Sequence, residues 1–380
     1  MKISGDWIGH PGTQVLCAVL AKAGYQALFV GGCVRNALLR VAVADIDIAT
    51  DAQPEIVSKL AKTAGFRVVP TGIEHGTVTV IAHGVAHEVT TFRRDVATDG
   101  RRAVVAFSTD VAEDAARRDF TMNALYARAD GAVLDPLGGL PDLLARRVRF
   151  VGEAVARIRE DYLRILRFFR FYAVYGNPDD GIDAEGLAAC AANADGIEGL
   201  SRERVGAEMR KLLAARDPAP AVAAMAQTGI LARVLPGSDA RALSILVHLE
   251  GDLPPRWQRR LAVLGGTDPG AALRLSRLET GSNIAVRDEI GSALTPAALG
   301  WKLGAEHAVD TVLCRASLFE SALPSNWQAE IARGATSAIP VTAADLMPAL
   351  QGAALGKKLH EIEARWLASD LYLRKSDLLA

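Results

Sequence analysis

The chain has 380 residues, of which 50% are hydrophobic, so it is long enough for more than one domain with a buried core. Its formal net charge is −1, so contact with nucleic acid must come from local basic patches. The widely spaced Cys17, Cys33, Cys190 and Cys314 argue against a disulfide framework or a thiolate zinc site and favour a cytoplasmic protein. The sequence shows neither a signal peptide nor an uncharged run long enough to span a bilayer, so we expect no membrane association.

Short apolar runs between glycines and polar turns predict an α/β region in the N-terminal part of the chain. Helices are expected at residues 13–23 and Val34–Arg40. Strands are expected at Tyr25–Val30, Ala44–Ala49, Thr77–Ala82, Val85–Phe92 and Ala103–Phe107, with a hairpin turn at His83-Gly84. The segment from Arg93 to Arg102 is polar and charged, so we interpret it as a mobile loop.

The character of the chain changes after Asp135-Pro136, where helix-forming sequence begins. We predict three segments: an α/β head with a small mixed sheet at residues 1–138, a helical neck at 139–215, and an all-α body and tail at 216–380. The predicted neck holds the clearest basic patch. Between Arg146 and Arg170, eight arginines and three acids give a net charge of +5.

Two aspartates in the segment ADIDIAT stand one residue apart in a predicted strand. The two-residue period of a strand puts Asp45 and Asp47 on one face, where their like charges repel each other. A divalent cation removes this conflict, and Mg²⁺ prefers oxygen ligands while leaving positions for substrate phosphates. Glu88, in a neighbouring predicted strand, is a third candidate carboxylate. These acids are candidate catalytic groups, although two acids on an exposed strand face are common without any such role.

Gly31-Gly32 joins an apolar predicted strand to an apolar predicted helix. Glycine lets the backbone approach a ligand closely, and the N-terminus of a helix favours phosphate. Arg35 stands one turn further along, where its charge can add a contact. An ordinary tight turn is the alternative interpretation, but the glycines and the two aspartates are predicted to lie on adjacent strands of one sheet.

Several segments occur in the same order as the signature motifs of a known family. They are GGCVRNALL with VADIDIAT, HEVTTFRRD, RRDFTMNAL, REDYLRILRFFRF and SRERVGAEM, and they run from residue 31 to about residue 209. In these segments the chain resembles the class II tRNA nucleotidyltransferases, which are CCA-adding enzymes and relatives of bacterial poly(A) polymerases. The resemblance implies a nucleotidyltransferase head and the template-independent addition of C, C and A to tRNA from CTP and ATP with Mg²⁺. Tyrosine and glutamate that are usual in the loop near Asp95 are missing, and the resemblance weakens after residue 215.

The resemblance also implies roles for single residues. Asp45, Asp47 and Glu88 match the carboxylates of the active site. Asp161 and Arg164 match the pair that reads the base. The further positions that match residues of the nucleotide site are Gly32, Arg35, Arg118, Arg167 and Arg170.

Asp161 and Arg164 make chemical sense as a base-reading pair, because a three-residue helical spacing places both on one face. Cytosine and adenine each present an amino donor beside a ring-nitrogen acceptor, whereas uracil and guanine present the opposite order. A mismatched buried polar group costs about 1–3 kcal/mol, so the pair would exclude UTP and GTP. A salt bridge on the helix surface is the alternative interpretation.

The chain departs from the family pattern at Asn36, where the glycine motif usually ends in Asp, so this position carries no charge. Three activities remain open from the sequence: CCA addition, a related addition of poly(A), CC or A alone, and RNA binding without catalysis. The acids and arginines that are present favour an enzyme. The expected partners are tRNA, CTP and ATP, and no obligate protein partner is evident.

Overall fold

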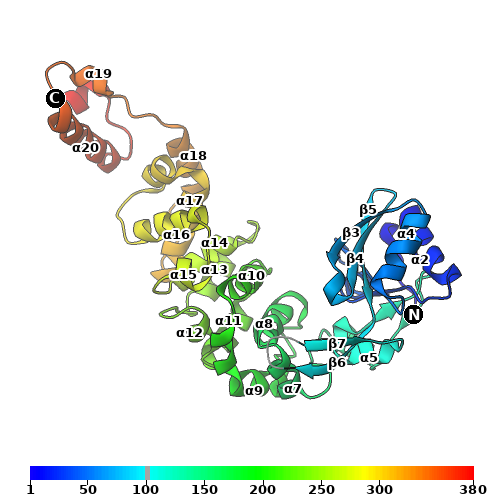
Figure 1. Cartoon of the computed structure of the whole chain (residues 1–380). Helices are drawn as coiled ribbons and strands as arrows, with labels where there is room; N and C mark the ends of the chain where they lie inside the picture. The colour runs from blue at the N-terminus through cyan, green and yellow to red at the C-terminus, as the bar shows by residue number, and fades with distance from the viewer. Residues whose placement is uncertain (99–102) are drawn as a thin grey trace. The chain divides into compact units, whose positions relative to one another are not determined.

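The computed structural model describes residues 1–98 and 103–380, which form two compact units, residues 1–200 and 201–380 (Figure 1). The first unit contains the named strands of the described chain, and the second is helical. The predicted fold class, an α/β head followed by helices, is therefore confirmed. The three segments with limits at residues 138 and 215 stay a prediction, and the two units divide the predicted neck after Leu200.

A mixed sheet of seven strands is the framework of the first unit in the described residues. In spatial order its strands are β3 (Arg67–Gly72), β4 (Thr77–Ala82), β5 (Val85–Thr91), β2 (Ile46–Thr50), β1 (Leu28–Val30), β8 (Tyr126–Ala127) and β9 (Val133–Leu134). β2 and β5 are parallel, and the other neighbours are antiparallel. The predicted hairpin at His83-Gly84 is confirmed, whereas β8 and β9 are too short for sequence alternation to predict them.

One face of this sheet is covered by two helices, α2 (Pro11–Lys22) and α4 (Pro54–Thr63), seen in blue in Figure 1. Ile48, Val89 and Val78 lie side by side on β2, β5 and β4 and are buried. Successive side chains of a strand point to opposite faces. Asp47 and Glu88, which stand next to Ile48 and Val89 in the chain, therefore lie on the face away from the two helices.

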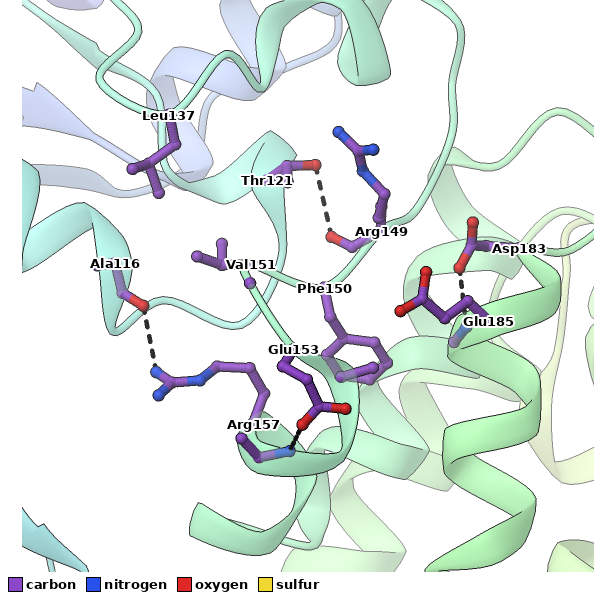
Figure 2. A pocket seen from close by; sticks show the side chains of 14 residues that line it. Ala116, Thr121, Leu137, Arg149, Phe150, Val151, Glu153, Arg157, Asp183 and Glu185 are labelled. Atoms are coloured by element: carbon purple, nitrogen blue, oxygen red, sulfur yellow. Dashed lines mark hydrogen bonds between the residues drawn. The ribbon is translucent and has the colours of Figure 1, made fainter.

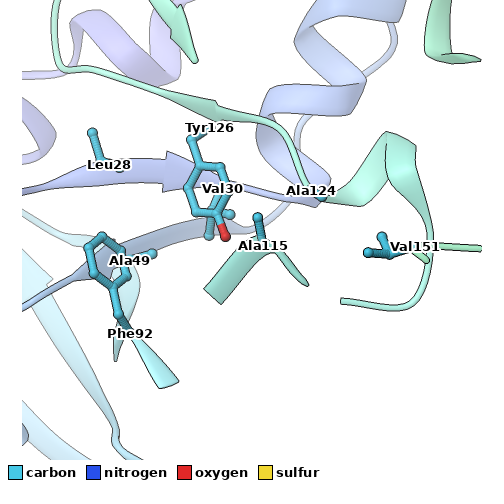
Figure 3. Packing of buried hydrophobic residues seen from close by; sticks show 8 residues of the cluster. All are labelled: Leu28, Val30, Ala49, Phe92, Ala115, Ala124, Tyr126 and Val151. Carbon is cyan, nitrogen blue, oxygen red and sulfur yellow. The ribbon is translucent and has the colours of Figure 1, made fainter. Parts of the chain in front are cut away.

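A second apolar cluster borders the face that carries Asp47 (Figure 3). It consists of Leu28, Val30, Ala49, Phe92, Ala115, Ala124, Tyr126 and Val151. Ala115 belongs to α5 (Val111–Ala116), which closes the cluster together with the strand residues. Ala49 lies two residues beyond Asp47 on β2, so its burial in this cluster fixes the backbone next to the candidate site.

The segment from Arg93 to Arg102 is not simply the loop that its polar composition suggests. β6 (Arg93–Thr98) and β7 (Ala103–Phe107) pair as an antiparallel hairpin, with an irregularity between Asp95 and Ala97. The loop prediction is wrong for residues 93–98, and the strand prediction for β7 is confirmed; residues 99–102 lie outside the described residues. A strand of a two-stranded ribbon need not bury a whole face, so it lacks the alternation that marks a strand in sequence.

The first unit contains further helices besides α2, α4 and α5. They are α1 (Asp6–Gly9), α3 (Gly32–Leu39), α6 (Leu140–Leu144), α7 (Ala154–Glu160), α8 (Leu163–Tyr175) and α9 (Ala184–Ala192). Asp161 has extended backbone between α7 and α8, and its carboxylate accepts a 3.1 Å hydrogen bond from the N–H of Leu163. The prediction that Asp161 and Arg164 share one face of a continuous helix is therefore wrong, because aspartate competes with the helix for backbone donors.

The second unit is built of helices that often begin at proline or at a capping side chain. They are α10 (Arg202–Leu213), α11 (Ala219–Gln227), α12 (Ile230–Val234), α13 (Leu243–Glu250), α14 (Trp257–Leu264), α15 (Pro269–Ala272), α16 (Arg277–Ile290), α17 (Pro296–Leu318), α18 (Trp327–Thr336), α19 (Ala343–Leu346), α20 (Gly352–Ala368) and α21 (Lys375–Leu379). α16 begins with a capping box between Ser276 and Glu279. In the described part of the chain, no helix combines the length and the apolar character needed to cross a membrane.

Buried charges tie α13, α14 and α17 together. Glu250 accepts hydrogen bonds from Arg259 (2.8 Å) and from Arg260 (2.8 and 3.1 Å), and Asp310 accepts one from Arg259 (2.8 Å). Arg260 also donates to the carbonyl oxygen of Leu213, the last residue of α10, and to that of Arg216, just beyond the helix. These side chains are at most 5% exposed, so each charge depends on its partners for stabilisation in the low-polarity interior.

We expect Glu250→Gln to destabilise the protein by about 3–5 kcal/mol, because it leaves buried guanidinium groups without full charge compensation. Urea unfolding of the full chain, followed by far-UV circular dichroism, measures the change. Glu306→Gln is the matched control, since Glu306 pairs with Arg256 from a side chain that is 66% exposed. Equal unfolding midpoints for the two variants would show that the buried cluster does not stabilise this unit.

Candidate active site

Asp47 and Glu88 are brought together by the parallel pairing of β2 with β5. The two residues stand in register, between the registered pairs Ile46–His87 and Ile48–Val89. Residues in register on neighbouring strands project to the same face, so the two carboxylates share the face away from α2 and α4. Glu88 is exposed and Asp47 is half-buried, which leaves this pair accessible from one side.

Asp45 is exposed and lies immediately before β2. Burial and the charge of Glu88 raise the pKa of Asp47 to about 6. Asp45 raises it as well, whereas Arg118 and Arg35 act in the opposite direction. Two of the predicted acids therefore act on the third, Asp47, and two of the predicted arginines lie close enough to oppose them.

The acids supply the type of ligand that a divalent cation such as Mg²⁺ requires. Among the residues described, no three His, Cys, Asp or Glu side chains form a complete metal cluster. Mg²⁺ is commonly held by one or two carboxylates together with substrate phosphates and water. Asp47, with Asp45 and Glu88 acting on it, fits such an incomplete site, because a cation would relieve the repulsion that raises the pKa of Asp47.

Gly31 and Gly32 form the turn from β1 into α3. Gly31 has φ 67° and ψ −119°, a conformation that side chains rarely adopt. No side chain caps α3, so the N–H groups of its first turn have neither a capping nor an intrahelical partner. β1 and β2 are antiparallel with Phe29 opposite Ile48, so the turn lies beside the start of β2. An uncapped helix N-terminus in this position suits a phosphate group.

Arg118 lies against this turn. A Cβ atom on Gly31 would be 3.3 Å from Arg118 Nη1. Arg118 donates to Asp114 (3.0 Å) and to the Tyr126 hydroxyl (3.1 Å), and that hydroxyl donates to Asp114 (2.6 Å). Burial alone would raise the pKa of Asp114, but Arg118 and Arg117 hold it below its usual value. The buried, ionised Asp114 therefore fixes the orientation of Arg118.

Arg35 is buried and is held by three neutral side chains. Its Nε and Nη2 donate to Asn36 Oδ1 (3.1 and 2.9 Å), its Nη1 to Asn123 Oδ1 (2.5 Å), and its Nη2 to the Tyr175 hydroxyl (2.6 Å). The Asn36 amide group also donates to the carbonyl oxygen of Ala42 (2.8 Å). An aspartate at position 36 could not make this last bond. The asparagine therefore links Arg35 to the loop that precedes β2.

Arg167 is held by a buried carboxylate. Asp119 accepts from Arg167 Nε (2.8 Å) and Nη2 (2.5 Å), and also from Asn123 Nδ2 (2.9 Å). Burial would raise the pKa of Asp119, but Arg167 and these hydrogen bonds lower it. The guanidinium carbons of Arg35, Arg167 and Arg170 lie 5.2, 5.3 and 4.6 Å from the centroid of the Phe171 ring. The structure therefore groups three of the predicted nucleotide-site arginines around one aromatic ring.

Arg164 lies next to the segment that carries Arg118. It donates to Glu160 (2.5 Å) and to the carbonyl oxygens of Arg157 (2.8 Å) and Arg117 (3.1 Å). Arg157 also pairs with Glu160, so this acid neutralises part of the basic patch seen in the sequence. The base-reading role of Asp161 and Arg164 stays a prediction, now with Asp161 in the break before α8.

The cavity of about 620 Å³ shown in Figure 2 lies outside the candidate site. Three of its polar wall groups already have partners: Arg157 donates to the carbonyl of Ala116 (3.2 Å), Glu153 caps α7, and Asp183 caps α9. Phe150 also lines the cavity, but its side chain is 3% exposed and its ring stacks against Phe168, with centroids 5.4 Å apart. None of the predicted site residues lines this cavity, so its volume does not mark the site.

Comparison with known proteins relates two regions of the chain to known domains. Residues 27–149 match the poly A polymerase head domain, and residues 181–241 match the probable RNA and SrmB- binding site of polymerase A. The chain is 45% identical over 204 residues to the CCA tRNA nucleotidyltransferase 1, mitochondrial, of Mus musculus, and 40% identical over 254 residues to the CCA-adding enzyme of Limosilactobacillus reuteri. In these regions the chain is similar to poly A polymerases and CCA tRNA nucleotidyltransferases.

The extent of these matches differs. The mouse alignment covers 53% of this chain and 47% of the mouse protein, and the L. reuteri alignment covers 64% and 61%, so the chain spans about half the length of the curated relatives it matches. The CCA-adding enzyme of Bacillus stearothermophilus in complex with CTP is similar over more of its length. Its structure has a TM-score of 0.74 and 29% sequence identity, covering 94% of this chain and 93% of that chain.

Several residues that hold the site together were not among the sequence predictions. Asp119 and Asn123 lie within the quoted segment RRDFTMNAL, so the motif pointed to them without showing which arginines they hold. Asp114 and Tyr126 look like an ordinary helix acid and an ordinary strand aromatic. Only the folded arrangement, which places both against Arg118, gives them a role.

Gly31→Ala and Gly32→Ala should have opposite effects on stability. At Gly31 an alanine would adopt a positive φ, which we expect to cost about 1–3 kcal/mol and to disturb Arg118. At Gly32, the first residue of α3, a Cβ would have only an ordinary 3.8 Å contact with Arg35, and alanine favours helix. Thermal unfolding of both variants and the wild type measures this, and equal losses would contradict the assigned turn geometry.

Asp47→Asn should raise the melting temperature of the protein without divalent cations by several degrees. The pKa of Asp47 is about 6 in the folded state and lower when unfolded, so its charge destabilises the folded state progressively as the pH rises from about 4 to 6 and fully above that. Asparagine removes this effect.

Melting curves at neutral pH, with and without MgCl₂, measure the change for Asp47→Asn. The exposed Asp179→Asn variant, in the loop after α8, is the control. Added Mg²⁺ should stabilise the wild type and the control more than Asp47→Asn. A cation effect of the same size in all three proteins would separate Asp47 from metal binding.

Proposed function

We propose that this protein adds C, C and A to the 3′ end of tRNA, using CTP and ATP without a template. The observation that carries the proposal is the registered pair Asp47–Glu88 beside the uncapped turn Gly31-Gly32 and Arg118. Carboxylates next to a phosphate-binding turn are the groups that nucleotidyl transfer requires. The names of the mouse and L. reuteri relatives, and the CTP complex of the similar B. stearothermophilus enzyme, support the same activity.

The triphosphate would bind at the start of α3. Gly31 and Gly32 leave space for a close approach, and the N–H groups of the first helical turn are oriented for phosphate oxygens. Arg118 stands beside the turn with its orientation fixed by Asp114. Arg35, Arg167 and Arg170 add positive charge around Phe171. The positions of these four arginines support the proposal that they hold the nucleotide phosphates.

Asp45 and Asp47 are the proposed ligands of Mg²⁺, with Glu88 beside them. Bound divalent ions would polarise the attacking 3′-hydroxyl and the departing pyrophosphate oxygens. Glu88 is exposed on the same face as Asp47, where its carboxylate could orient the attacking hydroxyl or accept its proton. The neighbouring arginines would offset the negative charge that the triphosphate brings to these acids.

Base selection would lie with Asp161 and Arg164. Arg164 is positioned by Glu160 and by the carbonyl of Arg117, next to Arg118 of the phosphate site. Asp161 is set outside the helix by the break before α8, so its orientation is not tied to a helical face. The pair would recognise the amino group and ring nitrogen that cytosine and adenine share.

The tRNA would be bound in part by the second unit and by the exposed arginines of the predicted neck, through phosphate contacts. We further propose that the protein is cytoplasmic and acts without an obligate protein partner. The buried, unpaired cysteines Cys17, Cys33, Cys190 and Cys314 support a reducing compartment.

Poly(A) addition is the second candidate, because residues 27–149 match the head domain of poly A polymerases. Addition of CC or A alone and RNA binding without catalysis are further outcomes to be distinguished. An assay of the product length and composition separates them.

Incubation with tRNA lacking one, two or three terminal nucleotides, together with each labelled NTP, should give a discrete product that ends in CCA and requires both CTP and ATP. The Asp45→Ala variant should bind tRNA as the wild type does but lose at least about a hundredfold in incorporation. Asp179→Ala, an exposed acid outside the site, is the control. A ladder of A residues would select poly(A) addition. Full turnover by the Asp45→Ala variant would show that Asp45 is not a ligand of the metal.

A further inference from the structure

Arg35 joins two elements that are far apart in the chain, α3 and α8. It is the fourth residue of α3, and its Nη2 donates to the hydroxyl of Tyr175, the last residue of α8. The Arg35 guanidinium also lies over the Tyr175 ring, 4.1 Å from the centroid. One tyrosine therefore holds this arginine through both its hydroxyl group and its aromatic face.

The hydrogen-bond acceptors of Arg35 carry no negative charge, so none of them compensates the charge of its guanidinium group. Its acceptors are the amide oxygens of Asn36 and Asn123 and the Tyr175 hydroxyl, all of which are neutral. By contrast, Arg118 and Arg167 each contact a buried carboxylate. Arg35 therefore contributes more unopposed positive charge to the turn than either of these neighbours. Four of the five N–H donors of its guanidinium are used, which fixes the orientation of the group.

A second, indirect route also runs from Arg35 to α8. Arg35 donates to Asn123, Asn123 donates to Asp119, and Asp119 accepts from Arg167 (2.5–2.9 Å at each step). This route passes through two intermediate side chains, those of Asn123 and Asp119. The Tyr175 contact is direct, so it fixes the distance between the start of α3 and the arginine-bearing side of α8 most closely.

We propose that Tyr175 is a positioning residue for nucleotide binding: it holds Arg35 and so keeps the phosphate-binding turn aligned with Arg167 and Arg170. The inference rests on the proposed function, because it assigns Tyr175 to the binding of the same nucleotide. It predicts an effect on the triphosphate and not on the base, since the contacts of Tyr175 lead to the turn and not to Asp161 or Arg164.

A purely structural tyrosine would be expected to bury its ring in the core. Phe171, one turn earlier on α8, fills that role and is 3% exposed, whereas Tyr175 is only half-buried. The hydroxyl of Tyr175 is occupied by Arg35 and, at 3.4 Å, by Asn36. Its hydroxyl is thus directed at the arginine and its neighbour, while its ring also packs against Phe171, with centroids 5.4 Å apart.

Tyr175→Phe removes the hydroxyl and keeps the ring, so the protein should fold. We expect the KM for CTP and for ATP to rise by the same factor, about fivefold or more, with kcat changed less than about twofold, because a hydrogen bond to a charged group is lost. Tyr175→Leu, which also removes the ring, should have a larger effect. Tyr25→Phe is the matched control, because within the described residues the Tyr25 hydroxyl has no hydrogen-bond partner.

Equilibrium binding of CTP and of inorganic triphosphate, measured by calorimetry without tRNA, gives a second readout. Both should bind Tyr175→Phe more weakly than the wild type by a similar factor, since inorganic triphosphate has no base. An unchanged KM and affinity, including the case in which only the melting temperature falls, would overturn the inference. A loss of affinity confined to CTP or to ATP would also overturn the inference. A wild-type protein that binds nucleotide but adds none would refute the proposed function, while the binding comparison would still decide the role of Tyr175.

Discussion

The parallel register of β2 against β5 is the constraint on which the candidate site depends. Ile48 and Val89 are buried under the helices on one face, and this fixes Asp47 and Glu88 on the other. A shift of one residue would turn a carboxylate into the helix-covered core and an isoleucine or valine into the site. The apolar pairs that stabilise the sheet therefore also set the acids opposite each other. The same strand register determines both the packing of the core and the position of the acids.

Most of the arginines near the site are held by acids, and this decides how its charge is used. Asp114 orients Arg118, Asp119 orients Arg167, and Glu160 orients Arg164. Asp119 lies outside residues 146–170 and neutralises Arg167, so the net charge of +5 counted for that basic patch overstates its free positive charge. Each pair lowers the conformational freedom of a long side chain before a ligand arrives, and such preorganisation improves binding more than an unpaired but mobile charge would.

The sequence predicted the elements that have a strong local signal. The strand–glycine–helix order around Gly31, the β4–β5 hairpin and the helical second unit follow from alternation, turn residues and helix-forming composition. It did not predict the β6 strand or the break at Asp161, because neither has an apolar period and the aspartate competes for a backbone N–H. Asp114 and Tyr126 could not be found from sequence either, since their role arises only when α5 and β8 meet at Arg118.

Asn36 shows how one substitution can couple the two halves of the site. Its amide oxygen accepts from Arg35 on the phosphate side, and its amide nitrogen donates to the carbonyl of Ala42, in the loop that leads to Asp45. A carboxylate could serve the arginine but would repel that carbonyl. The neutral side chain thus leaves Arg35 with an uncompensated charge while it anchors the approach to the metal-binding strand. The usual aspartate would place a negative charge beside Arg35. Asn36 gives up that charge, and its two hydrogen bonds instead fix the distance between the turn and the acids.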